Sequence, residues 1–492
     1  MSGLFFGLNI SLKGLMVQQA GLETTAHNIA NANTEGYSRQ RVNLEASQPI
    51  SGLVTGGGQL GSGVDIGSIT RVRQQYLDSE IRNETSQLEY QKAVAGTMNQ
   101  VQTVFMEPSD NGLNAQLADF WNQWQVLAAD PSSAPVRTAL KEASTALADT
   151  FQQINRQLGE IQAELQTQMD DTVAEVNELA AAIADLNKQI IRVKITGENP
   201  NDLTDKRDLL LDQLSALGDV TVTNSQDASG NYTGGVDVKL GNLTLVDSSG
   251  ATVISGADDL SSVNSGALGG LQILAGDGTS NSSVQYYIDR MNGLALSIAR
   301  TVNEIHAGGV DLNGDAGENF FIFTDSGGNP IDLSAVDWSD PAASGLGAAN
   351  LAVNPDIDAD ITRIAAAVSS SLVMEGNGDI ALQIARIGDA PMVYDPTSGL
   401  LASQTGGNYS IASFYQNLVT DIGSTVNGAE RKVDNIQALV DQVKSQRESI
   451  MGVSLDEESA HMIQYQHAYE ACAKVISIMD EMLDTLINGM KA

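Results

Sequence analysis

The C-terminal segment 462–492 places the strongest constraint on the fold. Its apolar residues recur at alternating steps of three and four: Met462, Tyr465, Tyr469, Cys472, Ile476, Met479, Leu483, Leu486 and Met490. This spacing predicts a helix with one continuous apolar stripe, interrupted by no glycine before Gly489 and by no proline. Because most helical stability comes from packing the apolar face, such a helix needs a partner that covers the stripe.

The N-terminal segment 4–31 repeats the same alternation. Its spaced residues are Leu8, Leu12, Leu15, Gln19, Leu22, Ala26 and Ile29. We therefore expect the two ends of the chain to meet as a pair of helices in a coiled coil. Two interpretations stay open at this point. The helices are either two amphipathic elements of one globular core, or an assembly seam that also pairs with neighbouring copies.

The charge of the chain argues against several classes of partner. Sixty-one acidic residues stand against 26 basic residues, which gives a formal net charge of −35. Such a field repels nucleic acid and anionic membranes, so we expect no nucleic-acid or membrane partner. No apolar run reaches the roughly 18 residues of a membrane span. The first residues lack the basic region of a secretory signal peptide, so export would need a route without a cleaved signal.

Periodic segments indicate a long helical framework. Helices are predicted at 4–31, 73–106, 113–129, 136–195, 202–217, 283–306, 409–450 and from Ser454 onward, with 357–373 and 378–387 as short candidates. Ser454 followed by Glu457 has the spacing of a capping box at the start of the last helix. The segment 136–195 would extend about 90 Å as one helix, a length that suits a fibre subunit better than a compact enzyme.

The segment 218–350 differs from this framework. Its apolar and polar residues alternate between Gly, Asn, Asp and Ser turns, which indicates antiparallel strands, with the helix 283–306 among them. The predicted fold class is therefore mainly α with a β-rich inserted domain. The predicted domains are a terminal coiled-coil domain (1–60 with 452–492), a helical-bundle rod domain (61–217 with 351–451) and an outer β-rich domain (218–350).

No residue pattern supports catalysis or a cofactor. The HExxH, CxxC and GxSxG motifs are absent, and the histidines stand apart, at His27, His306, His461 and His467. We interpret Cys472 as a small apolar residue of the stripe rather than a nucleophile. The string Asp311–Glu318 resembles a calcium loop, but Ala316 and Ile322 occupy the positions of its glycine and its last ligand, which favours a polar turn. We expect no catalytic, cofactor or metal site, and hence no enzyme.

Both ends of the chain resemble a known family. The run NIANANTEGYSRQ at 28–40 is similar to the N-terminal signature of flagellar axial proteins, with the motif residues Asn28, Asn31, Asn33, Gly36 and Tyr37. The segment GVSLDEESAHMIQYQHAYEACAKVISIMDEMLDTLI at 452–487 is similar to the C-terminal signature of that family. The internal blocks LADFWNQWQVLAADPSSAPVR, LTDKRDLLLDQLS and HAGGVDLNGDAGENFF resemble segments of the FlgK-type hook-associated proteins.

This resemblance implies a structural, non-enzymatic subunit of the bacterial flagellum at the junction between hook and filament. It implies an extracellular location reached by the flagellar type III route, and self-assembly into a ring. The implied partners are the hook protein, a second hook-associated protein and an export chaperone on the C-terminal helix. The terminal helices would line the axial channel, the rod would form the next shell, and the β-rich piece would face outward.

Two other interpretations remain. The first is another axial subunit, such as a hook or rod protein, against which the long helix 136–195 and the Trp121 and Trp124 segment argue. The second is an enzyme carried at the tip, a cell-wall hydrolase or a protease, which the missing motifs disfavour. Under the structural interpretation, the residues of the two stripes from Leu8 to Ile29 and from Met462 to Leu486 form the assembly seam.

Overall fold

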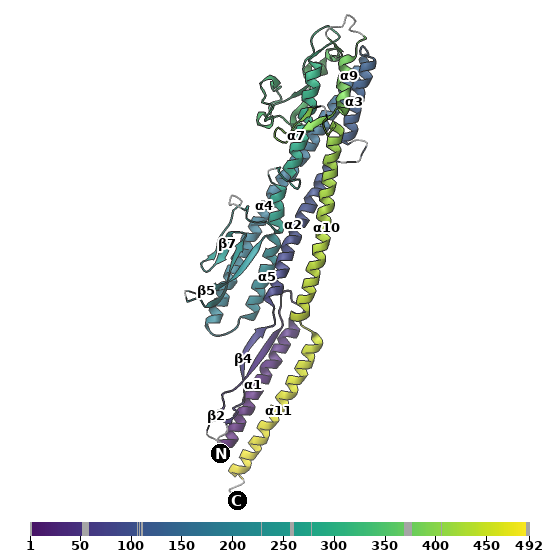
Figure 1. Ribbon diagram of the computed structural model, residues 1–492. Coiled ribbons are helices and arrows are strands. Elements are labelled where there is room, and N and C mark those ends of the chain that lie inside the picture. Colours follow the sequence, from purple (N-terminus) through teal and green to yellow (C-terminus); the bar gives the residue numbers. More distant parts are fainter. Residues whose placement is uncertain are drawn as a thin grey trace. The chain divides into compact units, whose positions relative to one another are not determined.

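The computed structural model is mostly helical and carries several small sheets (Figure 1). It describes residues 2–51, 59–105, 107, 109, 112–227, 229–255, 260–276, 278–368, 376–404 and 406–488. The chain divides into two compact units. Unit 1 comprises Met1–Glu89, Thr172–Ala267 and Asn435–Ala492, and unit 2 comprises Tyr90–Asp171 and Leu268–Asp434. Three long helices supply residues to both units: α2 (Gln75–Phe105), α4 (Ala134–Ile195) and α10 (Ile411–Met451).

The predicted long helices are present, and they end where glycine and proline residues predict. The short candidate 378–387 corresponds to α9, but the candidate 357–373 is wrong: its described part holds only the end of α8, a 3-10 turn and β12, and residues 369–373 lie outside the described residues. Helix α4 ends at Ile195, and Gly197 behind it takes a φ of +88°, which an L side chain rarely adopts. The last helix, α11 (Leu455–Asn488), starts after Ser454, whose Oγ accepts the N–H of Glu457 at 3.4 Å. The predicted capping box is only half formed, because the Glu457 carboxylate accepts instead from Arg39.

Unit 1 holds both terminal helices, α5 and the two largest described sheets. Strands β1 (Gln40–Ala46) and β4 (Val64–Arg71) pair antiparallel and pack against α1 (Ser2–Ala30). Strands β2 (Ile50–Ser51) and β3 (Gln59–Leu60) pair between them in the chain. After α5 (Asn201–Leu217), an antiparallel sheet contains, in order, β5 (Val220–Gln226), β6 (Tyr232–Leu240), β7 (Leu243–Asp247) and β8 (Gly250–Ala251).

Unit 2 contains the larger hydrophobic core. Helix α3 (Leu113–Ala129) and helix α7 (Val284–His306) supply buried aromatic and aliphatic side chains to it. Around them lie α6 (Gly266–Leu274), β9 (Gly309–Val310), β10 (Phe321–Phe323), β11 (Leu351–Val353), α8 (Pro355–Ala359), β12 (Ala367–Val368), α9 (Asp379–Ala385), β13 (Met392–Tyr394), β14 (Leu401–Ser403) and five 3-10 turns.

The predicted β-rich segment 218–350 is organised differently. Its one extended sheet covers 220–251, and the boundary between the units divides the segment after Ala267. Its described strands beyond α7 have only two or three residues. Between these strands the chain forms turns in which an Asp side chain accepts backbone N–H groups of the same turn. Asp325 Oδ1, for example, accepts the N–H groups of Gly327 and Asn329. The boundaries of the two compact units therefore differ from those of the three domains predicted from the sequence, and the three-domain division stays a prediction.

The calcium-like string also forms a self-stabilised turn. Asp311 Oδ1 accepts the N–H groups of Asn313 and Asp315 at 2.8 and 2.9 Å, so this oxygen is occupied within the loop. Among the described residues, no group of three His, Cys, Asp or Glu could hold a metal ion. None of the described helices is long and apolar enough to cross a membrane.

His306 is held as a neutral ring in the core of unit 2. The ring is fully buried, its Nε2 accepts the N–H of Ala365 at 2.8 Å, and its Nδ1 donates to the carbonyl of Glu318. Burial is the main reason why the pKa of His306 falls to about 4, and the nearby Arg137 acts in the same direction. Protonation would place a proton where Ala365 now donates, so the charged ring loses this contact.

We predict that His306 makes unit 2 acid-sensitive. A folded-state pKa below the unfolded value means that stability is fully present above about pH 6.5 and is lost as the pH falls towards 4. The shift corresponds to about 3 kcal/mol. His306→Gln should remove this part of the pH dependence, whereas His461→Gln, at an exposed position, should not. Urea unfolding at several pH values, followed by fluorescence of the buried Trp124, whose ring contacts His306, measures the free energy of unfolding. If this free energy depends on pH equally in both variants, His306 is not the cause of the acid sensitivity.

Candidate assembly interface

Helices α1 and α11 pack side by side and antiparallel (Figure 1). Three glycines of α1 define the contact, because a β-carbon built on each would meet a side chain of α11. Gly7 faces Met479, Gly14 faces Cys472 and Gly21 faces Tyr465. Each step of seven residues forward on α1 is a step of seven residues backward on α11. Glycine therefore lets the two helices approach closely at one position per heptad.

The predicted α11 stripe lies on the side that meets α1. Its residues from Met462 to Leu483 are half-buried, and the side chain of Leu486 lies outside the described part of the chain. On α1 the contact is displaced by one residue from the predicted stripe. Leu8, Leu15, Leu22 and Ile29 are half-buried, and each follows directly after a residue that contacts α11. One residue is about 100° of helix rotation, so much of the leucine stripe is turned away from α11.

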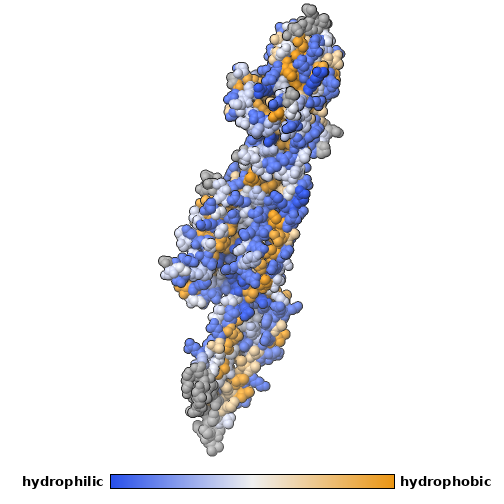
Figure 2. Space-filling model, in the orientation of Figure 1, coloured by the Kyte–Doolittle hydropathy of each residue, from blue (hydrophilic) through white to orange (hydrophobic). Residues whose placement is uncertain are grey.

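Large apolar side chains consequently reach the surface of this helix pair. On α1 these are Phe5, Leu12 and Met16, and in the second half of α11 they are Val475, Ile478 and Met482, each between 41 and 56 % exposed. Leu455 and Ile463, nearer the start of α11, are also exposed, at 53 and 55 %. The pairing of Gly7 with Met479 and of Gly14 with Cys472 places Leu12 opposite residue 474. The three exposed residues of α1 and the three in the second half of α11 therefore occupy the same stretch of the helix pair. We call these six residues the exposed stripe. Apolar atoms are visible along the helix pair in Figure 2.

Asn28, near the end of α1, joins α1 to β1 and to the start of α11. Its side chain is 1 % exposed, and its Nδ2 donates to the carbonyl of Gln40 and to Glu458 of α11. Its Oδ1 accepts from the N–H of Gln40 and from the Tyr37 hydroxyl at 2.7 Å. Burial, followed by the charge of Asp202, raises the pKa of Tyr37, so this hydroxyl stays a donor. These two motif residues fix where α1 ends relative to β1 and α11.

The other motif residues shape the turn after α1. Asn31 donates to the carbonyl of His27 and closes the helix end. Gly36 has a φ of +77° and packs on Leu209, so a side chain would be strained there. Asn33 is exposed, which leaves its side chain free of a packing role in a single chain. The motif thus serves first to hold the terminal segment in place.

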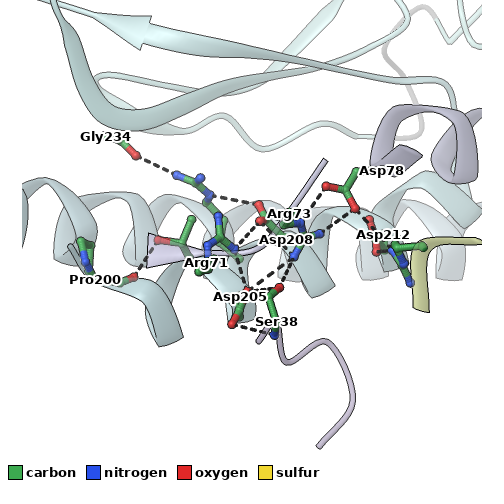
Figure 3. A network of polar contacts seen from close by, with 12 residues as sticks. Ser38, Arg71, Arg73, Asp78, Pro200, Asp205, Asp208, Asp212 and Gly234 are labelled. Atoms are coloured by element: carbon green, nitrogen blue, oxygen red, sulfur yellow. Dashed lines mark hydrogen bonds and ion pairs between the residues drawn. The ribbon is translucent and has the colours of Figure 1, made fainter. Parts of the chain in front are cut away.

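A polar network continues from this turn into α5 and α2 (Figure 3). Asp205 accepts from both the N–H and the hydroxyl of Ser38, at 3.1 and 2.7 Å, and from Arg71 at 2.7 Å. Arg73 binds Asp78 through two nitrogen atoms, at 2.7 and 3.0 Å. These charged side chains are largely buried, so each depends on its partners.

The charges in this network stay ionised because they face one another. Burial alone would raise the pKa of Asp208, but Arg73, Arg71 and Arg207 outweigh it and hold that pKa below its ordinary value. Burial would likewise lower the pKa of Arg73, yet Asp208 and Asp78 raise it. Arg447 of α10 binds Asp212 at 2.9 Å and brings a third helix into the network.

Sequence reasoning did not identify this network as a site. A signal exists in the spacing: Asp205, Asp208 and Asp212 lie on one helical face, and Arg71 and Arg73 alternate along an extended segment. Neither spacing says that the two sets meet, because 134 residues separate Arg71 from Asp205.

Comparison with known proteins identifies the chain over its full length. It is 31 % identical to flagellar hook-associated protein 1 of Bacillus subtilis strain 168, covering 100 % of this chain and 99 % of that protein. The chain belongs to the flagellar hook-associated protein 1 (FlgK) family. Its relative in Escherichia coli strain K12, with the same name, is 26 % identical over 98 % of this chain and 99 % of the relative.

Separate parts of this FlgK-family chain match three family models. Residues 98–321 match the flagellar hook-associated protein FlgK helical domain. Residues 8–37 match the flagella basal body rod protein family, and residues 444–489 match the flagellar basal body rod FlgEFG protein C-terminal family. The solved structure of the flagellar hook junction protein FlgK from Burkholderia pseudomallei shares the fold, with a TM-score of 0.57 and 15 % identity over 76 % of this chain and all of that one.

Family membership makes the chain an axial component of the flagellum, which assembles with other flagellar parts. Its relatives are structural proteins rather than enzymes, in agreement with the absence of catalytic motifs from the sequence. The paired helices described above are the parts that match rod-protein families at both ends of the chain.

We predict that Gly21→Ala loosens the α1–α11 pair. The new β-carbon would lie 2.7 Å from the Tyr465 ring, so the helices must separate or the ring must move, at a cost of about 1–3 kcal/mol. Alanine is otherwise the better helix former, which makes Gly423→Ala on α10 a matched control, because its β-carbon meets no atom within 4 Å. Hydrogen exchange of α11 amides should rise in the first variant only. Unchanged exchange in Gly21→Ala would refute the close contact.

We predict that Asp205→Asn strongly destabilises unit 1. The substitution removes one of the two carboxylates that pair with Arg71 in a largely buried site, which should cost about 3–5 kcal/mol. Asp202→Asn, at a side chain that is 59 % exposed, removes the same charge from the same helix and should cost less than about 1 kcal/mol. Urea unfolding monitored by circular dichroism compares them. Similar losses in the two variants would show that the network contributes no more than a surface pair.

Proposed function

We propose that this chain is a subunit of the junction between the flagellar hook and the filament, where it assembles with other copies through its terminal helices. The exposed stripe on α1 and α11 carries the proposal. Six large apolar side chains stand in one stretch of a helix pair whose remaining contacts are already made within the chain. Exposed apolar side chains gathered in one stretch of a structure favour an interaction site.

Burial of the exposed stripe between copies would supply the driving force. Fully burying one such side chain contributes about 1.5–3 kcal/mol before the cost of ordering is subtracted. The formal net charge of −35 keeps single chains apart in solution, so association depends on a specific fit of apolar surfaces. The same surface needs cover before assembly, and an export chaperone on α11 would supply it during export by the flagellar type III route.

The proposed arrangement in the flagellum follows the three predicted domains. The helix pair, with 1–60 and 452–492, would line the axial channel within a ring of copies. The helical rod would form the next shell, and the β5–β8 sheet would face outward. The hook protein on one side and a second hook-associated protein on the other are the proposed neighbours along the axis.

A second candidate is a hook or rod subunit. The matches of residues 8–37 and 444–489 to rod-protein families favour it. The match of residues 98–321 to the FlgK helical domain favours the junction, because it covers the whole of the long helix α4, which the rod-protein matches leave out.

We predict that the purified chain adds to the tips of isolated hooks, as seen by electron microscopy, and that a chain ending at His461 does not. Ile478→Asp should reduce the fraction of capped hooks strongly, because it places a charge in the exposed stripe without touching the contacts of Gly7 or Gly14. Ser477→Asp, an exposed neighbour with the same added charge, is the control and should cap normally.

The outcomes separate the two candidates. Capping by the full chain together with failure of Ile478→Asp supports the junction and the exposed stripe. Growth of long hook-like or rod-like extensions instead of a cap would favour the second candidate. Equal capping by Ile478→Asp and Ser477→Asp would show that the exposed stripe is not needed for assembly on the hook.

A further inference from the structure

Unit 1 contains a cavity of about 340 Å³ beside the polar network, and its lining is cationic. Strands β5 and β6 form one wall, and α5 with the start of α2 forms the other. Four guanidinium groups line it against two carboxylates: Arg71, Arg73, Arg82 and Arg207, with Asp78 and Asp208. This concentration of positive charge is unusual in a chain whose formal net charge is −35.

The wider network does not cancel this charge. Asp205 and Asp212 pair with these arginines from behind the lining, and Arg447 joins them. The whole cluster therefore holds five guanidinium groups and four carboxylates, a surplus of one positive charge. Lys194 adds another cation at the sheet side, 4.3 Å above the ring of the lining residue Tyr232.

Arg207 has a donor that the protein leaves unused. Its side chain is only 5 % exposed, and its Nη1 donates to Asn187 Oδ1 and to the carbonyl of Gly234. Its Nε has no hydrogen-bond partner, since the nearest carboxylate oxygen, Asp208 Oδ1, is 3.9 Å away. A buried charged donor without a partner is costly, so such groups are normally satisfied by water or a ligand.

Arg71 also lines the cavity, and its side chain is 18 % exposed. Both of its ion pairs, to Asp205 and Asp208, use Nη1. Among the described residues, no hydrogen bond involves its Nε or Nη2. A guanidinium with a free edge binds carboxylate and phosphate oxygens in a two-point contact, which is stronger and more directional than a contact to an ammonium group.

We propose that this cavity is a binding site for a small oxyanion, a phosphate or a carboxylate group, held by Arg207 and Arg71. The volume exceeds that of a single water many times, so an oxyanion with part of its water shell fits. The bound anion would tie the β5–β6 sheet to α5 and to the end of β4. Its effect is therefore a stabilisation of unit 1 that depends on anion concentration.

The test is a titration of the full chain with inorganic phosphate at constant ionic strength, with sodium chloride as the balancing salt. We expect saturable one-to-one binding by calorimetry and a melting temperature that rises with the logarithm of phosphate concentration. Arg207→Gln should weaken phosphate binding about tenfold or more. Arg431→Gln removes the same charge at an exposed position of α10, outside the cavity, and should bind as the unaltered chain does.

A second variant covers the case that Arg207→Gln does not fold. Val222→Phe fills the cavity from β5 and leaves every ion pair in place, so it should fold and lose phosphate binding. Acetate in place of phosphate tests the carboxylate class. Sedimentation in the same titration identifies the source: chains that separate on adding phosphate point to an acidic side chain of a second copy, and unchanged sedimentation points to a free anion. Absence of saturable phosphate binding by the unaltered chain, or equal binding by Val222→Phe, would overturn the proposal.

Discussion

The structure of the terminal region depends on how closely α1 and α11 approach. Glycine at one position per heptad of α1 removes the side chains that would hold the helices apart, and Met479, Cys472 and Tyr465 fill the space. This contact uses one face of each helix and leaves another apolar face uncovered. Under the proposed function, pairing within the chain and assembly between chains would use different surfaces of the same two helices, and neither would need the other to be broken.

The polar network explains how this pair is attached to the rest of unit 1. Asn28 and Tyr37 fix the end of α1, and the hydroxyl of Ser38, the next residue, donates to Asp205 of α5. Buried ion pairs contribute little net stability when compared with apolar packing, but removing one partner is costly. Such a network favours a fixed geometry, because another arrangement would separate buried charges from their partners. The oxyanion proposed for the cavity would complete that arrangement rather than add a separate activity.

Periodicity in the sequence was sufficient for the helices and for the α11 stripe, because packing of an apolar face leaves a pattern that can be read directly. It was insufficient for α1, where the contacting residues are glycines and carry no hydrophobic signal. In the segment that follows α7 it indicated strands and loops, but it did not show that the described strands have only two or three residues between Asp-centred turns. The Arg71–Asp205 contact was out of reach, since only the fold brings residues so far apart in the chain together. The resemblance of the termini to flagellar axial proteins supplied what the residue patterns left open.

The central claim is that α1 and α11 act in assembly as one paired unit, and a disulfide across the contact tests it most directly. A β-carbon on Gly14 lies 3.0 Å from Cys472 Sγ, so Gly14→Cys places a second thiol close to the only native cysteine. We expect oxidation to form this bond within one chain, as shown by peptide mapping, and the oxidised chain to cap isolated hooks as well as the reduced chain does. If the bond does not form, the helix register is wrong. If it forms and only the reduced chain caps hooks, the helices must separate to assemble, and the account is contradicted.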